Sequence, residues 1–110
     1  MGGSVKPLVW VGSSREDIRI FPESVRKQAG FELYRVQCGR EPSNWKPVST
    51  VGSGVREIRL RERNQYRVLY VANLTEAVYV LHAFVKKTPR TLKSDIELAK
   101  TRFKHLLTRF

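Results

Sequence analysis

Cysteine and histidine are scarce in this chain, and this scarcity excludes several classes of site. The single cysteine, Cys38, leaves no partner for an intramolecular disulfide and cannot build a cysteine-rich zinc site. The two histidines, His82 and His105, are distant in the sequence, so their spacing predicts no metal site. We therefore expect a protein that works without a metal or another cofactor.

Long apolar runs are missing as well. No stretch approaches the roughly 20 apolar residues that a membrane-spanning helix needs. The N-terminus lacks the basic segment and apolar core of a secretory signal, and residues 1–5 are expected to be a flexible leader. These absences predict a cytoplasmic protein with no membrane partner.

Acidic residues are the third scarcity. Ten Asp and Glu stand against 21 Lys and Arg, which gives a net charge of +11. Such self-repulsion indicates a partner of opposite charge, such as nucleic acid or an acidic protein. Residues 56–110 carry a net charge of +8 and residues 1–55 only +3, so the second half generates most of the positive electrostatic field of the protein. At 110 residues and 41% hydrophobic content, the chain is expected to form one globular domain over residues 1–110.

The first half of the chain predicts a short strand and a helical region. Residues 5–11 favour a strand that ends at Gly12, and residues 14–37 follow a helical spacing of apolar side chains. Pro22 interrupts this spacing and must kink or restart the helix. Residues 40–54 are rich in proline and glycine and indicate a loop, with a short extended piece at residues 48–51.

Three strands and a last helix follow. β-Branched and aromatic residues predict strands at residues 55–60, 66–72 and 77–85, joined as an antiparallel meander. Ser94 is the expected start of a C-terminal helix with an apolar stripe, formed by Ile96, Ala99, Phe103, either Leu106 or Leu107, and Phe110. The fold class is therefore α+β: a small antiparallel sheet with N-terminal helical segments and a C-terminal helix packed on it. Helices on one face would leave the other face partly open.

Basic side chains are concentrated on these strands. Alternation places Ile58 and Leu60 on one side of the first strand and Glu57, Arg59 and Arg61 on the other. A sheet needs no such charge to fold, so the cluster favours phosphate binding over surface decoration. The candidate RNA-binding residues are Arg56, Arg61, Arg63 and Arg90.

The register of the first hairpin decides which cations share a face. A simple hairpin opposes Leu60 to Arg67, which places Arg67 on the side of Ile58 and away from Arg59. A bulge within residues 61–66 would reverse this arrangement.

Several motifs together resemble a known toxin family. The chain contains GVREIRLRE, then YRVLYV, then VYVLHAFVKKTPRT, after the upstream segments 10–13, 21–22, 37–39 and 44–47. In this order they resemble the HigB-type branch of the RelE/ParE toxin superfamily, in its phage-derived-like form, from about Lys6 to Arg102.

The resemblance implies the toxin of a type II toxin–antitoxin pair. RelE and HigB relatives cleave mRNA on the translating ribosome, so the expected partners are the ribosome, mRNA and an adjacently encoded antitoxin with a helix-turn-helix domain. The ParE branch instead inhibits DNA gyrase without nuclease activity, which is one alternative. A non-catalytic nucleic-acid-binding module is another.

The resemblance also implies roles for individual residues. By position, Arg67 matches a phosphate-stabilising arginine, Lys87 (with Lys86 as its alternative) matches the basic residue that ends the last strand, and Arg59 matches a basic position on the first meander strand. Relatives often place a tyrosine, histidine or acid after the final basic turn, but the corresponding segment here is Thr88–Thr91.

The proton donor and acceptor are therefore less well marked than the cations. The candidate acid or base residues are His82 and Glu57. His82 shares strand parity with Val78, Val80 and Phe84, so a hydrogen-bonded core role competes with a catalytic one.

Overall fold

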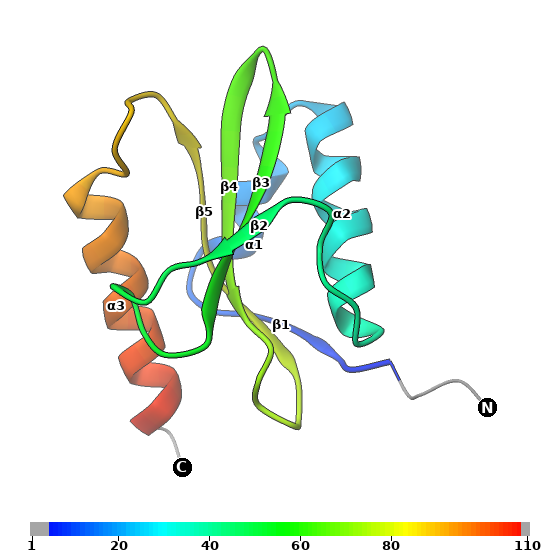
Figure 1. The fold of residues 1–110 in the computed structure, drawn as a ribbon, viewed down its shortest axis with the longest axis vertical. Helices are drawn as coiled ribbons and strands as arrows, with labels where there is room; N and C mark the ends of the chain where they lie inside the picture. Colours follow the sequence, from blue (N-terminus) through cyan, green and yellow to red (C-terminus); the bar gives the residue numbers. More distant parts are fainter. Residues whose placement is uncertain (1–4, 109–110) are drawn as a thin grey trace.

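The computed structural model describes residues 5–108, which form three helices and five strands (Figure 1). The α+β class expected from the sequence is confirmed. Most of the expected leader, residues 1–4, lies outside the described residues. The elements in chain order are β1 (Leu8–Trp10), α1 (Ser14–Arg19), α2 (Glu23–Gln37), β2 (Trp45–Pro47), β3 (Val55–Glu62), β4 (Asn64–Val71), β5 (Val78–Lys86) and α3 (Lys93–Thr108).

The five strands form one sheet in the order β1-β5-β4-β3-β2. The expected meander β3-β4-β5 lies at its centre and is antiparallel throughout, whereas β1 joins β5 in parallel. The short β2 pairs with β3 at the other edge and comprises residues 45–47, not the expected 48–51. β2 therefore brings the Asn44–Pro47 segment next to the basic strand β3.

The helical region divides at proline, as expected. α1 ends at Arg19, and Pro22 is the N-cap of α2 with φ −53° and ψ 150°. Proline is tolerated at a helix start because the amide it lacks would have no partner in the helix. The break turns the chain so that Ile18 on α1 and Phe21 before α2 both enter the core.

Helices cover both faces of the sheet, which corrects the expectation of helices on one face. α1 and α2 pack on the face that carries Ile58, Val68 and Val80. α3 lies across the opposite face, where Ala99 and Leu106 join strand residues of the second core cluster (Figure 1). The strands require this arrangement because consecutive residues of β4 and β5 are apolar on both sides, so both faces must be removed from water.

α3 covers only part of its face. Its contacts are with the half of the sheet that contains Val55, Leu69 and Leu81. Further toward the β3–β4 turn, the same face carries Glu57 and Arg59 in place of apolar residues. A charged area therefore continues directly from an apolar core.

The β3–β4 hairpin is longer than the sequence suggested, and its register is different. The two strands continue until Glu62 faces Asn64, and only Arg63 lies between them, with φ 61°. Arg59 is then directly opposite Arg67. The simple register that separated these two arginines was wrong, and they share a face without any bulge in this pair of strands.

A bulge occurs instead between β4 and β5. Tyr70 pairs with Val80 and Leu69 with His82, so Leu81 is an extra residue in β5. An extra residue reverses the alternation beyond it. His82 therefore lies on the α3 face with Phe84, and the expected parity with Val80 was wrong.

Of the two alternatives for the apolar stripe of α3, Leu106 is the buried residue and Leu107 is exposed. Leu106 is 4% exposed and Leu107 52% exposed, while Phe110 lies outside the described residues.

We predict that Leu106→Ala lowers the free energy of unfolding by about 2–4 kcal/mol, because it leaves a cavity beneath α3. Leu107→Ala, the matched control, should change it by less than about 0.5 kcal/mol. Urea unfolding of both variants tests this, and equal losses would contradict the placement of α3.

Candidate functional site

The uncovered half of the α3 face gathers one acid and several cations from three neighbouring strands. On β3, Glu57 and Arg59 point to this face, and Arg67 on β4 is opposite Arg59. On β5, Lys86 pairs with Gln65 of β4 and so has the same orientation as Arg67. These strands place the groups by alternation alone, since residues two apart share a face.

Glu57 and Arg67 form a buried ion pair at the centre of this area. Arg67 Nε lies 3.4 Å from Glu57 Oε1, and the two side chains are only 3% and 4% exposed. Burying either charge alone would be costly, so each depends on the other. Within residues 5–108, neither Glu57 Oε1 nor Arg67 Nε has a hydrogen-bond partner. The two groups therefore attract each other as opposite charges, without a well-aligned hydrogen bond between these two atoms.

Protein groups also hold the far end of the Arg67 guanidinium. Arg67 Nη1 donates to the Tyr66 carbonyl at 3.0 Å, and Nη2 donates to Gln65 Oε1 at 2.7 Å. Together with Glu57, these contacts fix the plane of the guanidinium. Arg67 is a positioned charge below the surface and not a mobile surface side chain.

Further cations surround the pair at the surface. Arg59 Nε lies 3.6 Å from Glu57 Oε1, and this side chain is 35% exposed. Lys46 on β2 is opposite Glu57 across the strand pair. Sequence reasoning missed Lys46 because its segment was assigned to a loop, although Asn44–Pro47 was part of the toxin resemblance. One carboxylate thus has four cations around it: Lys46, Arg59, Arg67 and Lys86.

Burial, together with the crowding of positive charge, shifts two pKa values downward. Burial lowers the pKa of Arg67, Glu57 opposes the shift, and Arg59 adds to it. Burial also lowers the pKa of Lys86, followed by repulsion from Arg67, while Glu57 again opposes the shift. Perturbed ionisable groups around a common centre are typical of functional sites.

A shallow pocket opens onto this cluster. Its volume is about 250 Å³, and it is lined by Asn44, Arg59, Leu60, Arg61, Gln65 and Arg67. A larger pocket of about 440 Å³ lies on the α2 side of the sheet, between Gly39, Arg56 and Tyr70. The smaller pocket is the one next to the buried pair and is the better candidate site.

Other residues singled out from the sequence lie away from the pair. Arg56 is on the α2 side, where it stacks 4.0 Å from the Trp45 ring and pairs with Glu41 at 3.5 Å. Arg63 is exposed at the hairpin turn, and Lys87 and Arg90 are exposed after β5. The structure therefore unites Glu57, Arg59, Arg61, Arg67 and Lys86, and it separates Arg56 from them.

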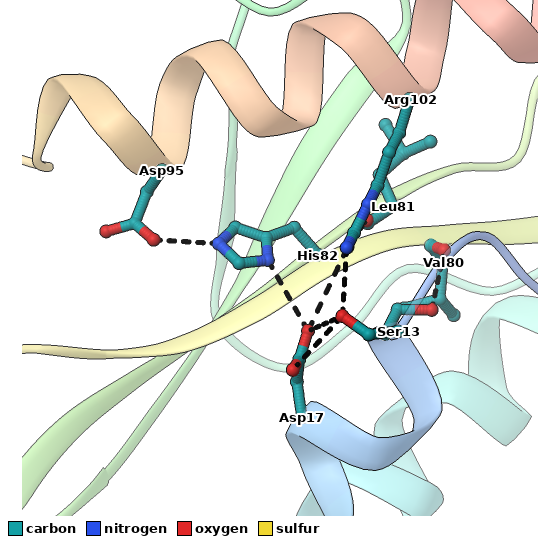
Figure 2. A network of polar contacts seen from close by, with 8 residues as sticks. Ser13, Asp17, Val80, Leu81, His82, Asp95 and Arg102 are labelled. Carbon is teal, nitrogen blue, oxygen red and sulfur yellow. Dashed lines mark hydrogen bonds and ion pairs between the residues drawn. The ribbon is translucent and has the colours of Figure 1, made fainter.

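His82 has a different environment from the cluster. It is 6% exposed, and its Nε2 lies 2.7 Å from Asp95 Oδ1 on α3 (Figure 2). Its ring stacks on Phe84, the cross-strand partner of Arg67, with centroids 5.1 Å apart. His82 thus neighbours the site through Phe84, while its own polar contacts face α1 and α3.

A comparison with models of protein families identifies the family of this chain. A family model described as "Phage derived protein Gp49-like (DUF891)" matches residues 16–104. The chain belongs to this family. The Gp49-like family is associated with toxin–antitoxin systems. The matched range includes α2 and the strands β2 to β5 in full, with most of α1 and α3, and it excludes β1.

Three further observations bear on this member of the Gp49-like family. A search of curated proteins finds no match. In the part of the chain from residue 5 to 108, no helix is both long and apolar enough to cross a membrane, and no three His, Cys, Asp or Glu side chains are arranged to hold a metal ion.

We predict that Arg67→Ala destabilises the fold strongly. Removing the guanidinium deprives the buried Glu57 carboxylate of its buried partner and leaves it with the more exposed Arg59, Lys46 and Lys86, which should cost about 3 kcal/mol of unfolding free energy. Arg61→Ala removes the same charge from an exposed position on the same face and should change stability by less than about 0.5 kcal/mol. Chemical denaturation measures both, and equal effects would contradict the buried pair.

The pKa of Lys86 offers a second test of the cluster. We predict a value below the ordinary 10.5 in the wild type, because burial and Arg67 both disfavour the ammonium. In Glu57→Gln the pKa should fall further, since the one nearby negative charge is lost. An NMR titration of the lysine side chain gives both values. A rise in the Glu57→Gln protein would show that Lys86 does not sense this carboxylate.

Proposed function

We propose that this chain is the toxin of a type II toxin–antitoxin pair and that it cleaves mRNA on the ribosome without a metal ion. The observation that carries the proposal is the buried Glu57 carboxylate within a ring of four cations, on the half of the sheet that α3 leaves uncovered. Membership of the Gp49-like family supports the toxin assignment. The HigB-type character of the toxin is part of the proposal and rests on the motif resemblance.

RNA cleavage of this type requires little from the protein. The ribose 2′-hydroxyl loses its proton, and its oxygen bonds to the adjacent phosphorus. The bond from phosphorus to the 5′ oxygen then breaks, and that oxygen takes up a proton. The products are a 2′,3′-cyclic phosphate and a 5′-hydroxyl. Negative charge increases on the phosphoryl oxygens during the reaction, so fixed cations lower the barrier.

The geometry suggests a division of roles. Arg59 and Lys86 are half-buried at the surface and are suited to contact the phosphate directly. Arg67 lies beneath them and contributes a charge whose orientation is already fixed. A positioned guanidinium of this kind requires no reorganisation when charge develops.

Glu57 and Lys86 are the proposed proton acceptor and donor. We assign the 2′ proton to the Glu57 carboxylate, whose Oε1 lies 3.4 Å from Arg67 Nε and 3.6 Å from Arg59 Nε. The lowered pKa of Lys86 makes its ammonium a better acid toward the 5′ oxygen. This assignment supplies a donor that the Thr88–Thr91 segment lacks.

The proposal includes an antitoxin as partner. A net charge of +11 favours association with an acidic protein or with RNA. We propose an adjacently encoded antitoxin with a helix-turn-helix domain, in keeping with the resemblance. The ribosome and mRNA are the proposed targets in the cytoplasm.

One observation favours a second candidate, a nucleic-acid-binding module without catalysis. The Arg67 guanidinium is engaged by Tyr66, Gln65 and Glu57, and its side chain is only 3% exposed. In such a module the cluster would hold RNA phosphates without cutting the chain. Cleavage assays separate the two candidates directly.

We predict that Arg59→Ala lowers the rate of mRNA cleavage about 100-fold, the usual effect of removing one group that stabilises developing charge. Arg26→Ala is the matched control, because it removes one exposed arginine from α2, on the other side of the sheet. The measurement is the mapping of mRNA 5′ ends after brief induction, together with growth.

The expected pattern is growth arrest and new 5′ ends for the wild type and Arg26→Ala, with both reduced for Arg59→Ala. New ends in equal number for the two variants would refute the site. Intact mRNA with the wild type, accompanied by arrest, would refute the nuclease and leave the binding module.

A further inference from the structure

We infer that His82 is a positioning residue that holds the start of α3 and thereby presents the basic segment between β5 and α3 to RNA. The nuclease part of this inference rests on the proposed function, but the positioning itself does not. The contacts of His82 with α1 and α3 are the starting observation (Figure 2).

The bulge in β5 aims His82 at α3. Because Leu81 is the extra residue, His82 faces the α3 side of the sheet, beside the first turn of that helix. Bulges redirect side chains in this way at the edges of sheets and next to active sites. β1 pairs with β5 only up to Val80, so His82 lies just beyond the protected part of this strand.

The hydrogen bond to Asp95 defines the state of the ring. At 2.7 Å from a carboxylate oxygen, Nε2 must carry the proton and donate it. Nδ1 lies 3.6 Å from Asp17 Oδ2, too far for a hydrogen bond, and has no other partner within residues 5–108. One strong contact therefore joins His82 to α3, and Asp17 adds only a nearby charge.

Side chains from both flanking helices fix the bulge that carries His82. Arg102 on α3 donates to the Leu81 carbonyl at 2.8 Å and to Ser13 Oγ at 2.9 Å (Figure 2). Ser14 on α1 donates to the Val80 carbonyl at 3.0 Å. These hydrogen bonds hold the bulge, and with it the His82 ring, in place. The hydrogen bond from His82 to Asp95 in turn holds the start of α3.

The contact closes a segment that carries three cations, of which Lys86 belongs to the proposed site. His82 and Asp95 are 13 residues apart, and Lys86, Lys87 and Arg90 lie between them. The next polar contact between β5 and α3 joins Leu81 to Arg102, which are 21 residues apart. Loss of the first contact lengthens the free segment without opening the core, because loop entropy rises slowly with length. The effect should be local.

The test compares two acids of α3. Asp95→Ala removes the partner of His82, whereas Glu97→Ala removes an exposed carboxylate that pairs with Lys100 at 3.6 Å. Both variants lose one negative charge from the same helix. Asp95→Asn retains an oxygen that can accept the His82 proton and serves as the conservative rescue.

Amide hydrogen exchange of the full chain is the first readout. We expect exchange in residues 87–96 to rise about tenfold or more in Asp95→Ala, with β3 and β4 unchanged, and to be near wild type in Glu97→Ala and Asp95→Asn. No change in residues 87–96, or a rise spread evenly over the chain, would overturn the positioning role.

Single-turnover and steady-state cleavage of ribosome-bound mRNA is the second readout. We expect KM to rise about tenfold in Asp95→Ala with kcat within twofold of wild type, since Lys87 and Arg90 would bind RNA equally in the ground and transition states while β4 keeps Lys86 in place. A loss of kcat with unchanged KM would place His82 in the chemistry and overturn the inference. A wild-type chain that cuts no RNA refutes the proposed nuclease, and the exchange result then decides the positioning alone.

Discussion

The rest of the site depends on the buried pair of Glu57 and Arg67. The pair lies where the α3 side of the sheet passes from apolar to charged. Neither charge could be kept there without the other, since an isolated buried ion costs several kcal/mol. The surface cations Arg59 and Lys86 are in turn arranged around the pair, because Glu57 offsets their mutual repulsion.

A pair of this kind is a poor device for stability. Apolar residues of similar volume often stabilise a core by about 1–4 kcal/mol more than a buried ion pair does. The α2 side of the same strands follows the apolar solution, with Ile58 and Val68 fully buried. On the α3 side the strands carry a buried ion pair beside a small pocket. This arrangement is therefore better explained by a function than by a contribution to stability. RNA cleavage is the function that we propose for it.

The sequence predicted the element types well because they depend on local patterns. Helical spacing, Pro22 and the β-branched runs placed the helices and the three meander strands close to their observed bounds. The sequence failed where one residue decides a register. Arg63 adopts a positive φ at the β3–β4 turn, and arginine gives no signal for that conformation. The sequence likewise carries no signal for the bulge at Leu81, which places His82 on the α3 face of the sheet.

The candidate site was recovered only in part for the same reason. Alternation along β3 correctly grouped Glu57, Arg59 and Arg61, but the simple register excluded Arg67 from the group. Lys46 was missed because its segment has the composition of a loop.

The most direct measurement of the role of the buried pair is cleavage of ribosome-bound mRNA by the double variant Glu57→Leu/Arg67→Met, with its unfolding free energy determined alongside. The account predicts a stable protein that no longer cleaves mRNA, whereas a destabilised protein that still cleaves would contradict it.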